Sequence, residues 1–216
     1  MNTPETPSAL SHAKSIAQEE PKRKRPKPGE RRIQILQALA EMLENPQGER
    51  VTTAALAAKI QVSEAALYRH FASKAQMFDG LIAFIEQTIF GLINQIITKE
   101  EDGRTQIQDI ARMMLAFSEK NPGMTRVLLG DSLFQEDTRL LERINQVLER
   151  IEASLKQSFR IMQTQHHLTW TAEDVSHRSG LVMSFVIGRW HRFARSGFTK
   201  SPLDNADASM GVLLVV

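Results

Sequence analysis

The segment VTTAALAAKIQVSEAALYRHFASK, residues 51–74, constrains the fold of this chain more than any other part of the sequence. Thr53 is a candidate N-cap, because a threonine hydroxyl accepts hydrogen bonds from the free amides of a first helical turn. Ser63 is a second candidate, and Leu67 and Phe71 follow it at i and i+4 spacing, on one helical face. The pattern predicts two short helices joined by a tight turn.

The outward face of the second helix indicates contact with DNA. Small residues at its start, Ala65 and Ala66, would let the helix enter a major groove about 12 Å wide. Tyr68, His70 and Lys74 could then reach phosphates. A half-buried surface pair is the alternative for Tyr68 and His70. The predicted DNA-contacting residues are Thr52, Thr53, Ser63, Glu64, Ala65, Ala66, Tyr68, Arg69, His70 and Lys74.

The rest of the sequence predicts helices and no strands, so we expect an all-α chain. Its 216 residues are 42% hydrophobic, enough to bury a core in a small domain and a larger one. Expected boundaries are residues 30–76 for a DNA-binding domain and 77–216 for a regulatory and dimerisation domain. Helices are expected at 30–44, 73–99, 105–120 with a capping box from Thr105 to Gln108, 124–129, 138–162, 172–196 and 203–214.

The N-terminal residues 1–29 include the basic and proline-rich run PKRKRPKPG. Such a run cannot bury apolar surface, so we expect a disordered extension. It is either a solubilising tail or an arm that neutralises DNA phosphates. No signal peptide is visible, and the longest uncharged apolar run, residues 180–188, is far shorter than the roughly 20 residues that span a bilayer. We therefore expect a cytoplasmic protein without a membrane partner.

The sequence contains no recognisable catalytic or metal-binding motif. The chain has no cysteine, which excludes disulfides, cysteine-ligated zinc and a thiol nucleophile. His166 and His167 are adjacent and lack the i, i+4 spacing of helical zinc ligands. No glycine-rich phosphate loop and no G-x-S-x-G motif occurs. We predict no catalytic residue, no metal site and no cofactor.

Residues 51–74 and their flanks resemble the N-terminal domain of the TetR family, from Arg32 to Ile82. The resemblance implies a three-helix DNA-binding domain with a helix-turn-helix, followed by a helical dimerisation domain. Gln61 departs from the family, which usually has glycine in the turn. A positive φ at this position would strain glutamine modestly.

A helix covering residues 180–188 would be apolar on all sides, so it needs partners on both faces. It is either a central core helix or a dimer contact, in which Gly180, Ser184 and Gly188 allow close approach. TetR resemblance implies a dimer through the last two long helices, and the apolar C-terminus, residues 212–216, fits that interface. A two-fold dimer would place two recognition helices on a palindrome, about 34 to 36 Å apart. A second dimer on the same double-stranded DNA is a further expectation.

Three further blocks resemble one branch of the family, the nucleoid occlusion factors. They are EAALYRHFASKAQMFDGLIAFIE, EKNPGMTRVL and RINQVLERIEASLKQ. Members of this branch bind palindromic chromosomal sites and, when bound, antagonise the tubulin-like division protein FtsZ. The resemblance therefore implies a nucleoid-associated protein with FtsZ as its partner.

The same resemblance implies an FtsZ-binding surface between the helices at 73–99 and 105–120. Lys120 stands where the branch usually has arginine, which keeps the charge but loses the planar fork. Leu92 stands where a basic residue is usual. Spacing alone favours the alternative, in which Phe84 and Met113 pack against each other at the margin of the core. The implied FtsZ-binding residues are Phe84, Met113, Ala116, Lys120 and Asn121.

A repressor released from its operator by a small ligand is the alternative function. It requires an enclosed pocket among the helices of the larger domain, with polar groups that orient the ligand. The inward faces of the expected helices carry few polar residues. We therefore expect no small-molecule ligand.

Overall fold

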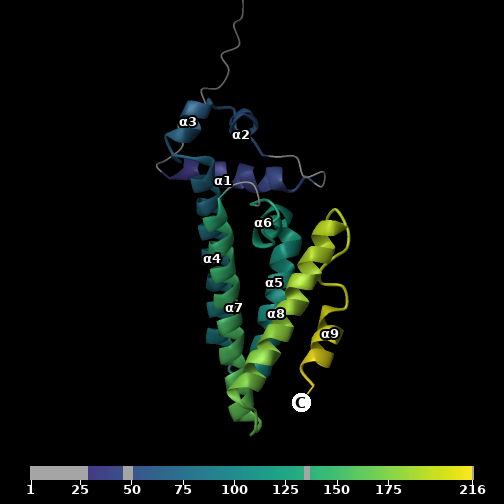
Figure 1. Cartoon of the computed structure of the whole chain (residues 1–216). Coiled ribbons are helices and arrows are strands. Elements are labelled where there is room, and N and C mark those ends of the chain that lie inside the picture. Colours follow the sequence, from purple (N-terminus) through teal and green to yellow (C-terminus); the bar gives the residue numbers. More distant parts are fainter. Residues whose placement is uncertain (1–28, 46–50, 134–136, 216) are drawn as a thin grey trace, which may run out of the picture.

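The computed structural model describes residues 29–45, 51–133 and 137–215, and within these ranges every regular element is a helix. The helices form a small head above an elongated body (Figure 1). The head consists of α1 (Glu30–Leu43), α2 (Thr53–Lys59) and α3 (Glu64–Tyr68). The body consists of α4 (Lys74–Lys99), α5 (Gly103–Lys120), α6 (Pro122–Leu128), α7 (Thr138–Gln165), α8 (Ala172–Arg195) and α9 (Ala206–Leu213).

The body packs around α5, which contacts α4, α6, α7, α8 and α9. Its core-facing side chains include Ile107, Ile110, Met114 and Phe117, which are all buried. Trp190 of α8 is fully buried, and its indole N–H donates to the Met114 carbonyl oxygen at 3.3 Å. The all-helical prediction is confirmed for the described residues.

Two helix caps differ from the sequence prediction. Thr52, not Thr53, caps α2, and its hydroxyl accepts from the Ala55 amide at 3.1 Å. The capping box from Thr105 to Gln108 is wrong, because Asp102 caps α5 and accepts from the Thr105 amide at 2.7 Å. A carboxylate accepts amide hydrogen bonds more strongly than a hydroxyl does, so Asp102 rather than Thr105 caps α5.

The Asp102 cap has a pH signature. Hydrogen bonds from the Thr105 side chain and amide lower the pKa of Asp102. A carboxyl whose pKa is lowered by folding stabilises the fold above its unfolded pKa. That contribution is lost as the pH falls through the lowered value.

The predicted boundaries and faces of three body helices also need correction. The helix expected at 124–129 begins at Pro122, a residue suited to a first turn because it lacks an amide hydrogen. The helix expected to end at residue 162 continues to Gln165. The last helix begins at Ala206 rather than Leu203, because Asn205 adopts a left-handed conformation (φ 54°) that interrupts a helix. On α7 the inward stripe includes Leu140 and Val147, with Leu141 and Leu148 only half-buried.

The head is attached to the body through α1, which packs on α4 and α6. Gly123, at the start of α6, lies against the backbone of α1. A Cβ added to Gly123 would stand 1.9 Å from the Ala40 carbonyl oxygen, so only glycine fits without a shift. The contact fixes α6 against the end of α1.

Among the described helices, α4 is long and apolar enough to cross a membrane by length and composition alone. Its apolar composition has another cause in this fold, because its buried residues pack in the common core with α1, α5, α6 and α7. On its charged side, Asp79 and Glu86 form ion pairs with Arg143 and Arg150 of α7. These are the features of a helix packed in a bundle.

Two predictions fall outside the described residues. The basic extension is one of them, apart from Gly29 at its end. The last residue of the apolar C-terminus, Val216, is the other. The domain boundaries at residues 29, 76 and 77 stay predictions.

Candidate functional site

The second helix of the predicted helix-turn-helix, α3, is held by its cap and by two buried anchors. The Ser63 hydroxyl accepts from the Ala66 amide at 3.2 Å, as predicted. Leu67 and Phe71 are buried in the core. In the preceding turn Gln61 has φ 55°, so the positive φ expected at this departure from the family pattern is present. The opposite side of α3 is thereby left open.

Most of the predicted DNA-contacting residues lie on that open side. Tyr68 keeps 45% of its surface exposed, which is unusual for a large aromatic residue and leaves its hydroxyl accessible. Ala66, His70 and Lys74 are half-buried. The exposed predicted contacts on α3 and at its two ends are Ser63, Glu64, Ala65, Tyr68 and Arg69.

Glu64 is engaged by a neighbour that the sequence pattern missed. The Thr53 hydroxyl donates to its Oε2 at 2.6 Å. This bond links the start of α2 to the start of α3. It also restricts the rotation of the Glu64 carboxylate. Two predicted DNA-contacting residues are therefore coupled to each other in this structure.

Arg32 of α1 is a second feature absent from the predicted set. Its guanidinium donates to the His70 carbonyl oxygen and lies 4.1 Å from the centre of the Phe71 ring. A cation over an aromatic face is attracted by the ring quadrupole. Arg32 therefore fastens α1 to the residues that follow α3.

Lys74 is the first residue of α4, the helix that follows α3 in the chain. Its ammonium lies 5.7 Å from the centre of the Phe78 ring, and Ser73 caps the helix by accepting from the Gln76 amide. The first amides of a helix attract anions, so a phosphate contact by Lys74 would be reinforced by its position.

A groove of about 460 Å³ lies between the second half of α4 and the middle of α5. Its apolar residues are Leu92, Ile96, Met113 and Ala116. Its polar and charged residues are Gln95, Lys99, Glu100, Asp109 and Arg112. The groove brings together two of the five predicted FtsZ-binding residues, Met113 and Ala116.

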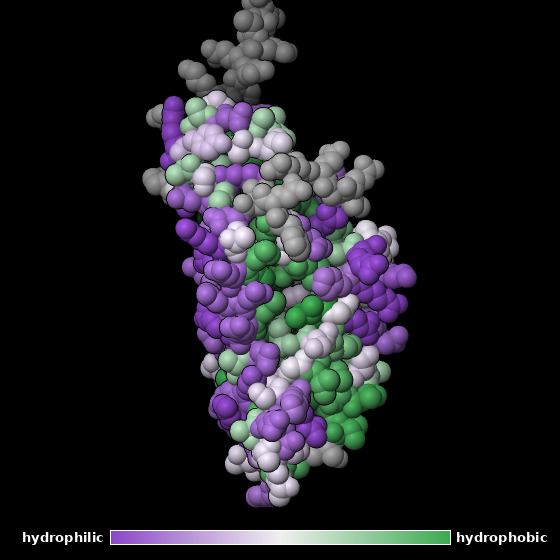
Figure 2. Space-filling model, viewed as in Figure 1, coloured by the Kyte–Doolittle hydropathy of each residue, from purple (hydrophilic) through white to green (hydrophobic). Residues whose placement is uncertain are grey.

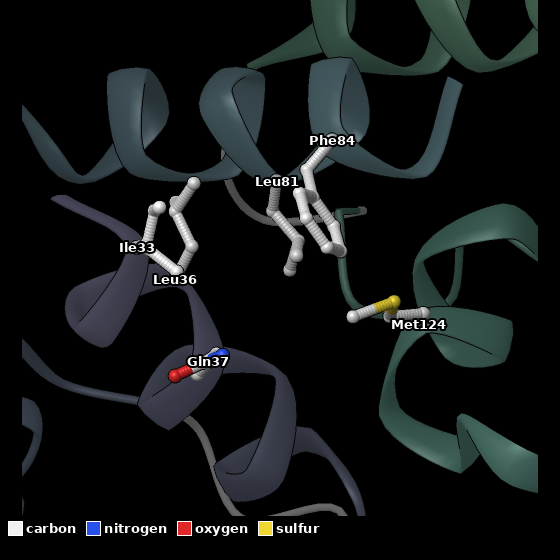
Figure 3. Close-up of a pocket in the computed structure, with 6 residues that line it drawn as sticks. All are labelled: Ile33, Leu36, Gln37, Leu81, Phe84 and Met124. Atoms are coloured by element: carbon white, nitrogen blue, oxygen red, sulfur yellow. The ribbon is translucent and has the colours of Figure 1, made fainter. Parts of the chain in front are cut away.

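Phe84 lies at a different hollow. It is 39% exposed and lines a small apolar space between α1, α4 and α6, together with Leu81 and Met124 (Figure 3). This hollow has a volume of about 10 Å³, room for about one water molecule. The prediction of one groove lined by Phe84 and Met113 together is therefore not what the structure shows.

Lys120 and Asn121 lie at the junction of α5 and α6. Lys120 is exposed at the last position of α5. The Asn121 side-chain amide donates to the Phe117 carbonyl oxygen at 2.7 Å, and the Asn121 backbone carbonyl oxygen accepts from the Thr125 hydroxyl at 3.0 Å. Asn121 is thus held in place by the junction, whereas Lys120 projects from it.

An exposed apolar face runs over α8 and α9. Leu181 is 57% exposed and Val212 is 75% exposed. Gly180 and Gly188 have no atom within 4 Å of an added Cβ, which leaves the face open to close approach. In Figure 2 the strongest hydrophobic colour gathers at the lower right, where Figure 1 places α8 and α9. Exposed apolar patches of this kind mark interaction surfaces.

The described residues contain no group of three His, Cys, Asp or Glu side chains that could hold a metal ion. His166 ends α7, and its ring lies 3.9 Å from Asp102. His167 adopts a left-handed conformation in the following turn (φ 52°). The two histidines thus lie at the C-cap of α7 and in the turn that follows it.

Two family models cover most of the chain. Residues 35–81 match the bacterial regulatory proteins of the TetR family, and residues 101–214 match the tetracyclin repressor-like C-terminal domain of SlmA-like proteins. Solved structures show the same fold at low identity. The chain is 14% identical to the regulator FadR from Bacillus subtilis in complex with stearoyl-CoA, with a TM-score of 0.68 over 84% of this chain and 97% of that one. AibR in complex with isovaleryl coenzyme A and operator DNA is 15% identical, with a TM-score of 0.66 over 84% of this chain and 97% of that one.

Several curated relatives have the same name, nucleoid occlusion factor SlmA. The nucleoid occlusion factor SlmA of Alteromonas mediterranea is 50% identical over 81% of this chain and 89% of its own length. SlmA of Vibrio cholerae is 46% identical over 85% of this chain and 93% of its own length. These relatives are named as nucleoid occlusion factors and the matched N-terminal family as regulatory proteins, so the prediction of a protein other than an enzyme is confirmed. The chain belongs to the TetR family and, within it, to the branch of the nucleoid occlusion factors named SlmA.

Proposed function

We propose that a homodimer of this chain binds palindromic chromosomal sites and, while bound, antagonises FtsZ assembly, so that no septum closes over the DNA. The observation that carries the proposal is the separation of two open surfaces in one chain. The exposed side of α3 faces outward at the head, and the groove begins at Leu92, about 27 Å along α4 from Lys74 at 1.5 Å per residue. Both surfaces can be occupied at once.

The character of the groove supports a peptide as its occupant. Its apolar residues are flanked by charged ones, and helix-lined grooves of this composition bind short segments through a few apolar anchors. The identity to proteins named nucleoid occlusion factor supports a division protein as the source of that segment. Met113 and Ala116 would contact it within the groove, and Lys120 and Asn121 at its end. Phe84 would belong to a separate part of the surface.

The alternative, a ligand-released repressor, has one observation in its favour. Two solved structures with this fold, FadR and AibR, are in complex with CoA thioesters. Among the described residues, the five fully buried polar side chains all form hydrogen bonds, and the Ser132 hydroxyl is the buried polar atom without a partner. Gln106 accepts from the Ser158 hydroxyl at 2.8 Å, and Thr125 donates to the Ser118 carbonyl. Little polar surface is therefore left in the core to orient a ligand.

The test is an FtsZ assembly assay with GTP, followed by light scattering and sedimentation. Palindromic DNA is first obtained by in vitro selection with the same protein. Protein with this DNA should shorten or disassemble FtsZ polymers, and protein with scrambled DNA should not. The double variant Phe84→Ala with Lys120→Ala should keep DNA binding and lose the antagonism. Gln87→Ala, an exposed change on α4 outside the groove lining, is the control.

The opposite results would favour the repressor. Unchanged FtsZ polymers in the presence of selected DNA would contradict the proposal. Release of that DNA by stearoyl-CoA or isovaleryl-CoA, measured by fluorescence anisotropy, would support the alternative.

A further inference from the structure

Arg112 lines the groove, but its charge is held by a residue from the far end of the chain. Its Nε donates to Oδ1 of Asp207 at 3.0 Å, and its Nη2 donates to Oδ2 of the same carboxylate. Asp207 lies in the first turn of α9. Two parallel bonds between a guanidinium and one carboxylate form a fork that is both directional and stronger than a single contact.

The pair changes the charge that the groove presents. Four charged residues line it: Lys99, Glu100, Asp109 and Arg112. Because Asp207 neutralises Arg112, Lys99 is the lining cation without an ion pair in the described part of the chain. With Arg112 masked, the groove carries more negative than positive charge. Acidic side chains of a peptide would be repelled by the groove until Arg112 is released from Asp207.

We propose that Asp207 is an internal stand-in for a carboxylate of the bound peptide, and that Arg112 is the residue by which the groove selects an acidic segment. Binding exchanges one carboxylate for another on the same guanidinium. Arg112 turns from α9 toward the groove, and Asp207 returns to water. The inference rests on the proposed function, because it assumes that an FtsZ tail peptide occupies this groove.

The exposure of the pair makes such an exchange feasible. The Arg112 side chain is 57% exposed and the Asp207 side chain is 72% exposed. Exposed ion pairs contribute little to stability, because both partners are well solvated when apart. Asp207 also lies near the positive end of the α9 dipole, which keeps its carboxylate stable after release. Rotation of the Arg112 side chain is sufficient, and no helix has to move.

The experiment measures binding of a fluorescent peptide of the FtsZ carboxyl-terminal tail to the full chain on its selected DNA. Asp207→Asn should tighten binding about two- to fivefold at low salt, the factor by which an exposed pair masks Arg112. The affinity should also fall more steeply with salt, because a free guanidinium then contacts the peptide. Arg112→Gln should weaken binding, and adding Asp207→Asn to it should change nothing more. Asp204→Asn removes the same charge just before α9 and should have no effect.

A second peptide tests the chemistry of the partner. When its Asp and Glu residues are replaced by amides, the wild-type chain and Asp207→Asn should bind it equally. If Asp207→Asn does not fold, as judged by circular dichroism, Asp207→Ser takes its place in the same comparison.

The failures of the inference and of the proposed function are separate outcomes. No binding of the peptide to the wild-type chain on DNA would contradict the proposed function. If the wild-type chain binds the peptide and Asp207→Asn binds it with the same affinity, the proposed carboxylate exchange at Arg112 is overturned and the proposed function is not. An effect of Asp207→Asn that persists in the Arg112→Gln background would also overturn it, because the carboxylate would then act without Arg112.

Discussion

At the scale of single residues, the helix-turn-helix depends on the turn at Gln61 and on side-chain contacts of Glu64 and Arg32. Gln61 was recognised as a strained turn position, and it has φ 55° in the structure. Glu64 was assigned an outward position, which is correct, but its hydrogen bond from Thr53 depends on the angle between α2 and α3. Arg32 belongs to a region of ordinary basic residues, and its contact with His70 spans 38 positions. The periodicity of apolar residues within one helix does not predict contacts between side chains of different helices.

Lys74→Ala tests the assignment of a phosphate contact. Loss of one cation at the start of α4 should weaken binding to every DNA sequence and lower the slope of log K against log salt by about 1. The preferred bases should stay the same. Fluorescence anisotropy over a salt series measures both quantities.

Lys200→Ala is the matched control for this variant. It removes the same charge from an exposed position after α8, at the level of the body. It should leave the slope unchanged. A shift of base preference in Lys74→Ala would contradict the phosphate assignment.

At the scale of helices, boundaries were predicted well where a single strong signal exists. The helix expected at 172–196 spans Ala172–Arg195, where Thr171 caps it with a reciprocal box to Asp174 and Gly197 follows it with φ 64°. The start of α5 was missed because two residues three apart could each have capped it. Asp102 prevails, since its carboxylate accepts from both the amide and the hydroxyl of Thr105. Competing caps are decided by strength, which residue spacing does not rank.

Gly123→Ala tests the contact between α1 and α6. Its Cβ would collide with the Ala40 carbonyl, so the two helices must separate. Overpacking of this kind costs about 1 to 3 kcal/mol and should lower the melting temperature by several degrees. DNA affinity should fall as well, because α1 carries Arg32 at the head.

Gly91→Ala provides the contrast on α4. No atom lies within 4 Å of its added Cβ, and it is exposed in the middle of the helix. Alanine has the higher helix propensity, so this change should stabilise the fold by up to about 1 kcal/mol. Differential scanning calorimetry of the two variants distinguishes a packing effect from a propensity effect. Equal shifts in both would contradict the tight contact at Gly123.

At the scale of the whole molecule, one chain leaves an apolar face on α8 and α9 open to water. The alternative of a central core helix for residues 180–188 is half right, because Val182, Met183 and Val186 are buried while Leu181 is not. The exposed half is what a second subunit would cover. We therefore keep the dimer through Gly180, Ser184 and Gly188 as a prediction.

Leu181→Arg tests that dimer. A charge on the open face of α8 should shift the protein to monomers in sedimentation velocity, because burying an unpaired guanidinium is costly. Binding to a palindrome should weaken, while binding to a half-site should change little. Gln87→Arg introduces the same side chain on α4 and should leave the oligomeric state unchanged. Monomers in the wild-type chain at micromolar concentration would contradict the prediction.

The sequence by itself determined the helical class, the helix-turn-helix with its Ser63 cap, and the family, because these depend on residues within a few positions of one another. Only the tertiary structure decided which surfaces those helices share. It separates Phe84 from Met113, since α1 and α6 enclose one part of α4 and α5 flanks another. It also joins Arg112 to Asp207 across 95 positions. Such pairs follow from how helices pack around a common core, and helical periodicity fixes the face of each helix but not its neighbour.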